Sequence, residues 1–130
     1  MPIRLLIIDD EPDIRTYLMA ALADSGYTTF ELTEEDSITD AAIALNPNLI
    51  LLDIMMPLRS GLSIYAELRQ NPATRTIPVV LMTGMTWETE LSNEALTERL
   101  SDQQVPMPDG LIEKPIDMEK LKTLINKLSR

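Results

Sequence analysis

The sequence alternates between short stretches that favour β-strands and longer stretches with helical periodicity, five times in succession. Four of the short stretches are mostly apolar, and the one between them is alternating and β-rich. They are Ile3–Ile8, Tyr27–Leu32, Leu49–Leu52, Val79–Met82 and Leu111–Ile112. This alternation predicts a parallel sheet covered by helices on both faces, and ten elements are too few for an eight-stranded barrel.

Apolar residues at helical spacing mark the stretches between the predicted strands. These stretches are 14–22, 38–45, 62–68, 91–100 and 118–128, and the fourth has the least regular pattern. Pro12 suits the first turn of the first helix, and Gly26 suits its end. Ser60 and Asp117 suit the N-cap positions of the third and fifth helices. We therefore expect five helices.

Length and terminal sequence restrict the organisation. With 130 residues the chain has the length of one domain, so we expect a single domain over residues 1–130. The N-terminus has no signal-peptide core, and no apolar run approaches the roughly 20 residues of a membrane span. We expect a cytoplasmic protein with no membrane contact.

Charge and two missing residue types restrict the chemistry. The chain has 21 Asp and Glu against 11 Lys and Arg, a net charge of −10. Nucleic acids and anionic membranes need a basic surface, so neither is expected as the main partner. The sequence contains no Cys and no His, which excludes disulfides, thiolate nucleophiles and imidazole bases. Carboxylates, hydroxyls and amines remain as reactive groups.

Polar residues follow the predicted strands at their carboxyl ends, where open parallel sheets bind their ligands. They are Asp9, Asp10, Asp53, Thr83 and Lys114. Any one of these carboxylates could simply cap the next helix, but all five residues together favour a shared site. Three converging carboxylates repel one another, and a divalent ion such as Mg²⁺ offsets that repulsion.

Such a site can support phosphoryl transfer to a carboxylate. Asp53, on the central strand of the three, is the best-placed nucleophile for an aspartyl phosphate. Mg²⁺ on Asp10 and Asp53 would balance the charge of the phosphoryl oxygens. The Lys114 ammonium and the Thr83 hydroxyl would supply a cation and a hydrogen-bond donor. The residues therefore favour Mg²⁺-dependent phosphorylation of Asp53.

Four motifs occur in order along the chain. They are Leu6-Ile7-Ile8-Asp9-Asp10-Glu11-Pro12, Asp53-Ile54-Met55-Met56-Pro57-Leu58-Arg59-Ser60-Gly61, Thr83-Gly84 and Lys114-Pro115. Together they resemble the response-regulator receiver domain of two-component signalling, including the chemotaxis regulators. The resemblance covers the whole chain. It implies a flavodoxin-like (βα)5 fold, a doubly wound five-stranded parallel sheet with strand order 2-1-3-4-5.

The resemblance also implies a role for each site residue. Asp53 would accept the phosphoryl group from the phosphohistidine of a sensor kinase. Asp9 and Asp10 would bind Mg²⁺ together with Asp53, and the backbone carbonyl of Met55 would be a further ligand. The residues that would sense the phosphate are Thr83 and Lys114.

The implied partners are other proteins or domains. Since the chain has no His, the donor must be a separate sensor kinase or phosphotransfer protein, or another domain. The phosphorylated form would signal to a downstream protein partner or output domain, with a phosphorylation-dependent homodimer as a further option. We expect a self-phosphorylating switch that turns over no external substrate, and therefore not an enzyme.

Two features depart from the family pattern. Leu111 occupies the position where the family usually carries an aromatic switch residue, and we interpret it as a core residue of the last strand. The segment 85–110 is longer than the family norm and contains Trp87, the only tryptophan. We interpret the segment as an extended fourth helix and a loop, with a partner surface as the alternative.

Three other functions are weighed against the receiver. A pseudo-receiver interaction module usually lacks the acceptor or the lysine, and both are present here. A Mg²⁺-dependent phosphatase with an aspartyl nucleophile typically has a second Asp two residues later, where this chain has Met55. An FMN-binding flavodoxin needs a phosphate loop after the first strand, where Asp9, Asp10 and Glu11 would repel phosphate.

Overall fold

The computed structural model describes residues 2–33, 37–54, 56, 60–83, 98, 100–102 and 104–129. In chain order its strands and helices are β1 (Arg4–Ile8), α1 (Pro12–Asp24), β2 (Thr28–Leu32), α2 (Ile38–Leu45), β3 (Leu49–Asp53), α3 (Gly61–Gln70), β4 (Val79–Thr83), β5 (Gly110–Glu113) and α5 (Met118–Leu128). None of the helices in these ranges is long and apolar enough to span a membrane.

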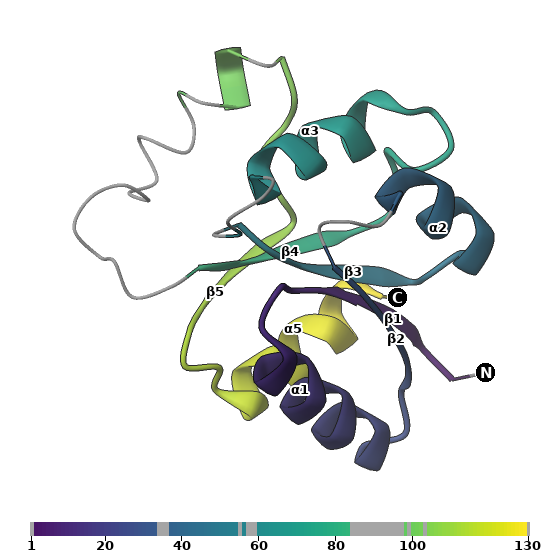
Figure 1. Cartoon of the computed structure of the whole chain (residues 1–130), viewed down its shortest axis with the longest axis vertical. Coiled ribbons are helices and arrows are strands. Elements are labelled where there is room, and N and C mark those ends of the chain that lie inside the picture. The colour runs from purple at the N-terminus through teal and green to yellow at the C-terminus, as the bar shows by residue number, and fades with distance from the viewer. Residues whose placement is uncertain are drawn as a thin grey trace.

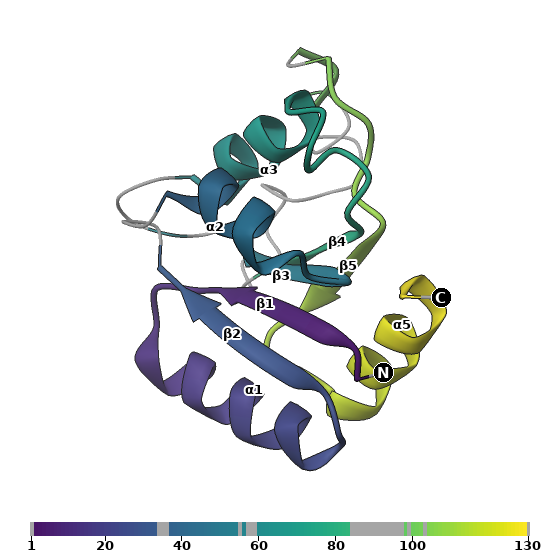
Figure 2. The same cartoon turned by 90° about the vertical axis from the view of Figure 1, so that its right-hand side faces the viewer.

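The five strands form one parallel sheet in the order β2-β1-β3-β4-β5. Helices α1 and α5 cover one face of the sheet, and α2 and α3 cover the other (Figures 1 and 2). This is the doubly wound, flavodoxin-like arrangement predicted from the sequence, with the predicted strand order. The site edge is therefore the one at which β1, β3, β4 and β5 end.

The two faces of the sheet contribute to two separate hydrophobic clusters. Alternate residues of β1 enter different clusters: Leu5 and Ile7 pack with α1 and α5, and Leu6 and Ile8 pack with α2 and α3. All five residues of β3 and of β4 are buried, because these strands have neighbours on both sides and helices on both faces. The strands that carry Asp53 and Thr83 are thus the most firmly enclosed.

The predicted helix ends are confirmed at four positions. Pro12 lies in the first turn of α1, and Gly26 follows that helix with a φ of +93°, a left-handed conformation that favours glycine. The Ser60 hydroxyl and the Asp117 carboxylate accept hydrogen bonds from backbone N–H groups in the first turns of α3 and α5. These caps fix where α3 and α5 begin relative to the strand ends.

Arg69 of α3 joins several segments at the amino-terminal edge of the sheet. Its Nη2 contacts Asp109 Oδ2 at 2.6 Å, its Nη1 donates to the Ile77 carbonyl at 2.7 Å, and its Nε donates to the Tyr65 hydroxyl at 3.1 Å. Asp109 Oδ2 also accepts the backbone N–H of Val79 at 2.9 Å. We call these contacts the Arg69 network. It holds the segments that enter β4 and β5 against α3.

The interpretation of Leu111 as a core residue is wrong. Its side chain is 38% exposed, whereas Ile112 beside it is buried in the cluster under α1 and α5. The physical reason is that β5 is an edge strand, with β4 on one side only. An edge strand need not bury both of its faces, so a short apolar pair there does not indicate two core residues.

Much of the segment between β4 and β5 lies outside the described residues. This applies to Trp87 and to most of the predicted fourth helix at 91–100. Residues 98 and 100–102 are helical, and Leu100 is buried in the cluster with α2 and α3. The division of the chain into a single domain with a long 85–110 segment stays a prediction.

Candidate functional site

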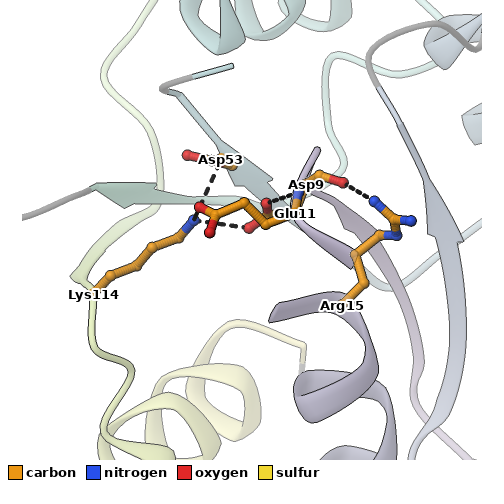
Figure 3. A network of polar contacts seen from close by, with 5 residues as sticks. All are labelled: Asp9, Glu11, Arg15, Asp53 and Lys114. Carbon is orange, nitrogen blue, oxygen red and sulfur yellow. Dashed lines mark hydrogen bonds and ion pairs between the residues drawn. The ribbon is translucent and has the colours of Figure 1, made fainter. Parts of the chain in front are cut away.

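Three strand ends bring acidic and basic side chains to one edge of the sheet. Asp9 directly follows β1, Asp53 is the last residue of β3, and Lys114 directly follows β5. Since β1 and β3 are paired neighbours, Asp9 and Asp53 come to lie side by side. Lys114 reaches toward them from the end of β5, two strands away from β3 and three from β1 (Figure 3). The rule that sites form at strand carboxyl ends thus holds in this structure.

The ammonium group of Lys114 contacts three carboxylates. Its Nζ lies 2.9 Å from Asp9 Oδ2, 3.2 Å from Asp53 Oδ2 and 3.4 Å from Glu11 Oε1. Asp9 and Asp53 are fully buried, at 0% and 1% exposure. One partly buried cation therefore contacts residues more than sixty positions away from it in the sequence.

The charges around Lys114 alter its acid–base behaviour. Burial alone would lower the pKa of Lys114, because a charged ammonium loses hydration. The hydrogen bond to Asp9 and the negative charges of Asp53 and Asp9 outweigh burial, so its pKa is raised. Lys114 is therefore a fixed positive charge at neutral pH.

Four carboxylates converge in the same place. Asp9, Asp10, Glu11 and Asp53 each offer an oxygen, and these oxygens all lie within 4.8 Å of one another. Like charges at this separation repel strongly, and Lys114 balances only one of them. Hard carboxylate oxygens are the ligands that Mg²⁺ takes in proteins, so the donor set fits the predicted metal.

The loop after β1 is fixed by two local contacts. The backbone N–H of Glu11 donates to Asp9 Oδ1 at 2.9 Å, which turns the chain into α1. Arg15, in the second turn of α1, donates from Nη1 to the backbone carbonyl of Asp9 at 2.6 Å. Its Nε also lies 3.3 Å from Glu31 Oε1 on β2. The Asp9–Asp10 turn is thus held by the start of α1 and, through Arg15, is linked to β2.

The start of α3 lies directly against the backbone of Asp53. The Gly61 N–H donates to the Ile54 carbonyl at 3.3 Å. A Cβ built at Gly61 would overlap the Asp53 carbonyl oxygen and the Ile54 Cα. Only a residue without a side chain allows this approach, which explains why the motif ends in glycine at this spacing.

Thr83 ends β4 beside Lys114. Its side chain is buried at 3% exposure, and its backbone carbonyl accepts the Lys114 N–H at 2.7 Å. Met55, expected to offer a backbone carbonyl to the metal, lies outside the described residues. The structure therefore brings together five of the six predicted site residues, while the chemical role of each stays a prediction.

Sequence reasoning missed two residues at this site. Glu11 was considered only as a repulsive neighbour of the two aspartates, and its contact with Lys114 depends on the packing of β5. Arg15 gave no motif signal. Its position one helical turn after Glu11 could have indicated it, because helical side chains point back toward the helix N-terminus.

Comparison with known proteins gives consistent results. The family model described as the response regulator receiver domain matches residues 5–126. Protein Rrf1 of Nitratidesulfovibrio vulgaris is 28% identical over 127 residues, covering 98% of this chain and 83% of Rrf1. Response regulator Rre1 of Synechocystis is 33% identical over 132 residues, covering 98% of this chain. This chain spans about half of Rre1, 52% of its length.

Solved structures share the fold. A response regulator protein from Burkholderia multivorans is 34% identical, with a TM-score of 0.70 and coverage of 100% of this chain and 97% of that one. The receiver domain of sensor histidine kinase PA1611 from Pseudomonas aeruginosa is 22% identical, with a TM-score of 0.79 and coverage of 99% and 98%. Its structure contains a magnesium ion in the active site cleft. From the matched family model, the relatives and the acidic pocket, we conclude that this chain belongs to the response regulator receiver domain family of two-component systems.

Proposed function

We propose that this chain is a phosphoacceptor receiver domain that takes a phosphoryl group onto Asp53 in a Mg²⁺-dependent step. The observation that carries the proposal is the buried Asp53 carboxylate, which contacts Lys114 and lies within 4.8 Å of three further carboxylates. Repulsion among these carboxylates lowers the stability of the fold when no cation is bound. Such a cluster therefore favours a ligand-binding role.

The ligands of the metal would be carboxylates from two neighbouring strand ends. Asp9, Asp10 and Asp53 would hold it, with the Met55 backbone carbonyl as a further ligand. A bound Mg²⁺ neutralises the developing charge on phosphoryl oxygens. The magnesium ion described for the PA1611 receiver domain supports this assignment by likeness of fold.

Each site residue of this chain would have its own role in the transfer of the phosphoryl group. A carboxylate oxygen of Asp53 attacks phosphorus, and the new O–P bond forms as the P–N bond to the donor histidine breaks. The electron pair of the broken bond stays on the imidazole of the donor. Lys114 provides the positive charge beside the incoming oxygens, and Thr83 provides a hydroxyl at the end of β4.

The partners follow from the composition and the family. Because the chain contains no His, the phosphohistidine must belong to a sensor kinase, a phosphotransfer protein or another domain. The phosphorylated form would shift between two conformations and signal to a protein partner or output domain, with homodimerisation as one route. We place this switch in the cytoplasm and regard residues 1–130 as one receiver domain.

Incubation with acetyl phosphate and Mg²⁺ tests the proposal directly. Intact-mass spectrometry should show one added phosphoryl group on the wild-type protein, and none when EDTA replaces Mg²⁺. The Asp53→Asn variant should gain none. Asp40→Asn, a matched change of an exposed carboxyl on α2, should be modified like the wild type.

Two results would contradict the proposal. A wild-type protein that gains no phosphoryl group with donor and Mg²⁺ would indicate a pseudo-receiver. An Asp53→Asn protein modified to the wild-type extent would place the acceptor elsewhere.

A further inference from the structure

Arg15 contacts the loop that carries Asp9 and Asp10, and it is not one of the proposed metal ligands. Its side chain is only 14% exposed, and it bridges α1, the end of β1 and β2. The contact with the Asp9 carbonyl is a charge-assisted hydrogen bond of 2.6 Å. That carbonyl is on the peptide that connects Asp9 to Asp10.

From this geometry we infer that Arg15 is a positioning residue for the divalent-cation site, acting through the Asp9–Asp10 peptide. The inference rests on the proposed Mg²⁺ site and adds a residue to it. Arg15 itself would touch neither the metal nor the phosphoryl group.

The Ile8–Asp9 peptide, just before the Asp9–Asp10 peptide, is held by the sheet. The Asp9 N–H donates to the Leu32 carbonyl at 3.3 Å, at the last rung of the β1–β2 ladder. Beyond that rung the Asp9 carbonyl has left the sheet, and Arg15 donates to it. A displacement of this peptide would move both carboxylates relative to Asp53, because the Cα atoms that carry the two side chains lie at its two ends.

Glu31 orients the guanidinium of Arg15. The Glu31 carboxylate on β2 lies 3.3 Å from Nε, while Nη1 reaches the Asp9 carbonyl. A planar guanidinium can hold two acceptors in fixed directions, which an ammonium group cannot do. The result is a link from β2 through Arg15 to the end of β1.

Electrostatics and positioning make opposite predictions for the loss of Arg15. Arg15 is a positive charge near the site, so its removal should tighten Mg²⁺ binding if charge alone matters. If Arg15 positions the Asp9–Asp10 peptide, its removal should weaken Mg²⁺ binding. The sign of the change therefore separates the two effects.

The test is a calorimetric Mg²⁺ titration of the unphosphorylated full chain. The Arg15→Gln variant should bind Mg²⁺ about tenfold more weakly than the wild type, in the range found when residues that orient metal ligands are changed. Arg75→Gln is the matched control, because it removes the same charge from an exposed position in the α3–β4 turn. It should change the affinity less than twofold.

Thermal unfolding in metal-free buffer identifies a merely structural role. Such a role would lower the unfolding temperature of Arg15→Gln and leave its Mg²⁺ affinity unchanged, which would overturn the inference. An affinity equal to or tighter than that of the wild type would also overturn it. If Arg15→Gln fails to fold, Arg15→Lys replaces it. Lysine keeps the charge and loses the paired donors, so weaker Mg²⁺ binding by this variant reports the loss of positioning alone.

The same titration distinguishes this inference from the proposed function. A wild-type protein that binds no Mg²⁺ contradicts the proposed function itself. In the other case the wild type binds Mg²⁺, Asp10→Asn binds it more weakly and Arg15→Gln binds it with wild-type affinity. That result supports the metal site and contradicts only the role of Arg15.

Discussion

Two partly buried cations organise opposite edges of the same sheet, and their surroundings differ in charge. Arg69, with 6% of its side chain exposed, meets one carboxylate, two backbone carbonyls and a phenol at the amino-terminal edge. Lys114, at 13%, meets three carboxylates at the carboxyl-terminal edge. The Arg69 network is balanced in charge, whereas the cluster around Lys114 carries an excess of negative charge.

The difference separates a structural network from the proposed metal site. Each nitrogen of the Arg69 guanidinium donates to an acceptor in the protein, so the network is complete without any ligand. The carboxylates near Lys114 repel one another, and a divalent cation would relieve that repulsion. The contacts at the amino-terminal edge of the sheet therefore stabilise the fold, whereas the carboxylates at the carboxyl-terminal edge are suited to binding a cation.

Loss of the arginine should have the largest effect on stability. The Arg69→Met variant leaves Asp109 and the Ile77 carbonyl without their charged donor, and we expect a loss of roughly 3 kcal/mol in the free energy of unfolding. Urea unfolding measures it, with the exposed Arg75→Met as control. A loss of unfolding free energy below about 1 kcal/mol would show that the Arg69 network contributes no more than a surface salt bridge.

Neutralising one carboxylate at each edge should change stability in opposite directions. In metal-free buffer we expect Asp10→Asn to stabilise the protein by about 1 kcal/mol, because it relieves repulsion among four carboxylates. Asp109→Asn should destabilise it by about 1 kcal/mol, because it weakens the acceptor of Arg69 and of the Val79 N–H. Chemical denaturation of both variants measures this. Changes of equal sign would remove the contrast between the two edges.

The smallest expected effect is a pH dependence from Lys114. Its folded-state pKa is raised above 10.5, so its contribution to stability is complete below pH 10.5 and is lost as the pH rises through the folded value. Burial also raises the pKa of Tyr65, against the effect of Arg69, so the whole protein loses stability in alkali. Comparison with Lys114→Gln isolates the lysine.

We expect the stability difference between wild type and Lys114→Gln to be constant from neutral pH to about 10 and to shrink above it. Unfolding free energies at several pH values measure it. A difference that grows in alkali would contradict the raised pKa.

The fold could be predicted because its signals are local. Strand and helix patterns, Pro12, Gly26 and the caps at Ser60 and Asp117 depend on near neighbours in the sequence. The structure confirms five strands, four of the five predicted helices and these end positions, and most of the predicted helix at 91–100 lies outside the described residues. The convergence of Asp9, Asp53 and Lys114 followed from a general rule about parallel sheets. No side-chain geometry was needed for it.

The remaining features depend on contacts between distant elements. The Arg69–Asp109 pair spans 40 positions and the Lys114–Glu11 pair spans 103. No periodicity marks either pair, and the motifs that contain Glu11 and Lys114 do not show that the two side chains touch. The predicted strand order already put the last strand at the sheet edge, but an apolar pair does not reveal which of its residues the helices cover, so the interpretation of Leu111 was wrong. Side-chain reach and the coverage of an edge strand are properties of the assembled fold.

The Arg69 network also affects how the sequence between β4 and β5 can change in length. One guanidinium holds the approach to β4, through Ile77, and the residue just before β5, Asp109. The β4–β5 register is therefore anchored outside the connecting sequence, and lengthening a connection adds little closure entropy. Lys114 can therefore keep its place beside Asp53 when the length of the β4–β5 connection changes.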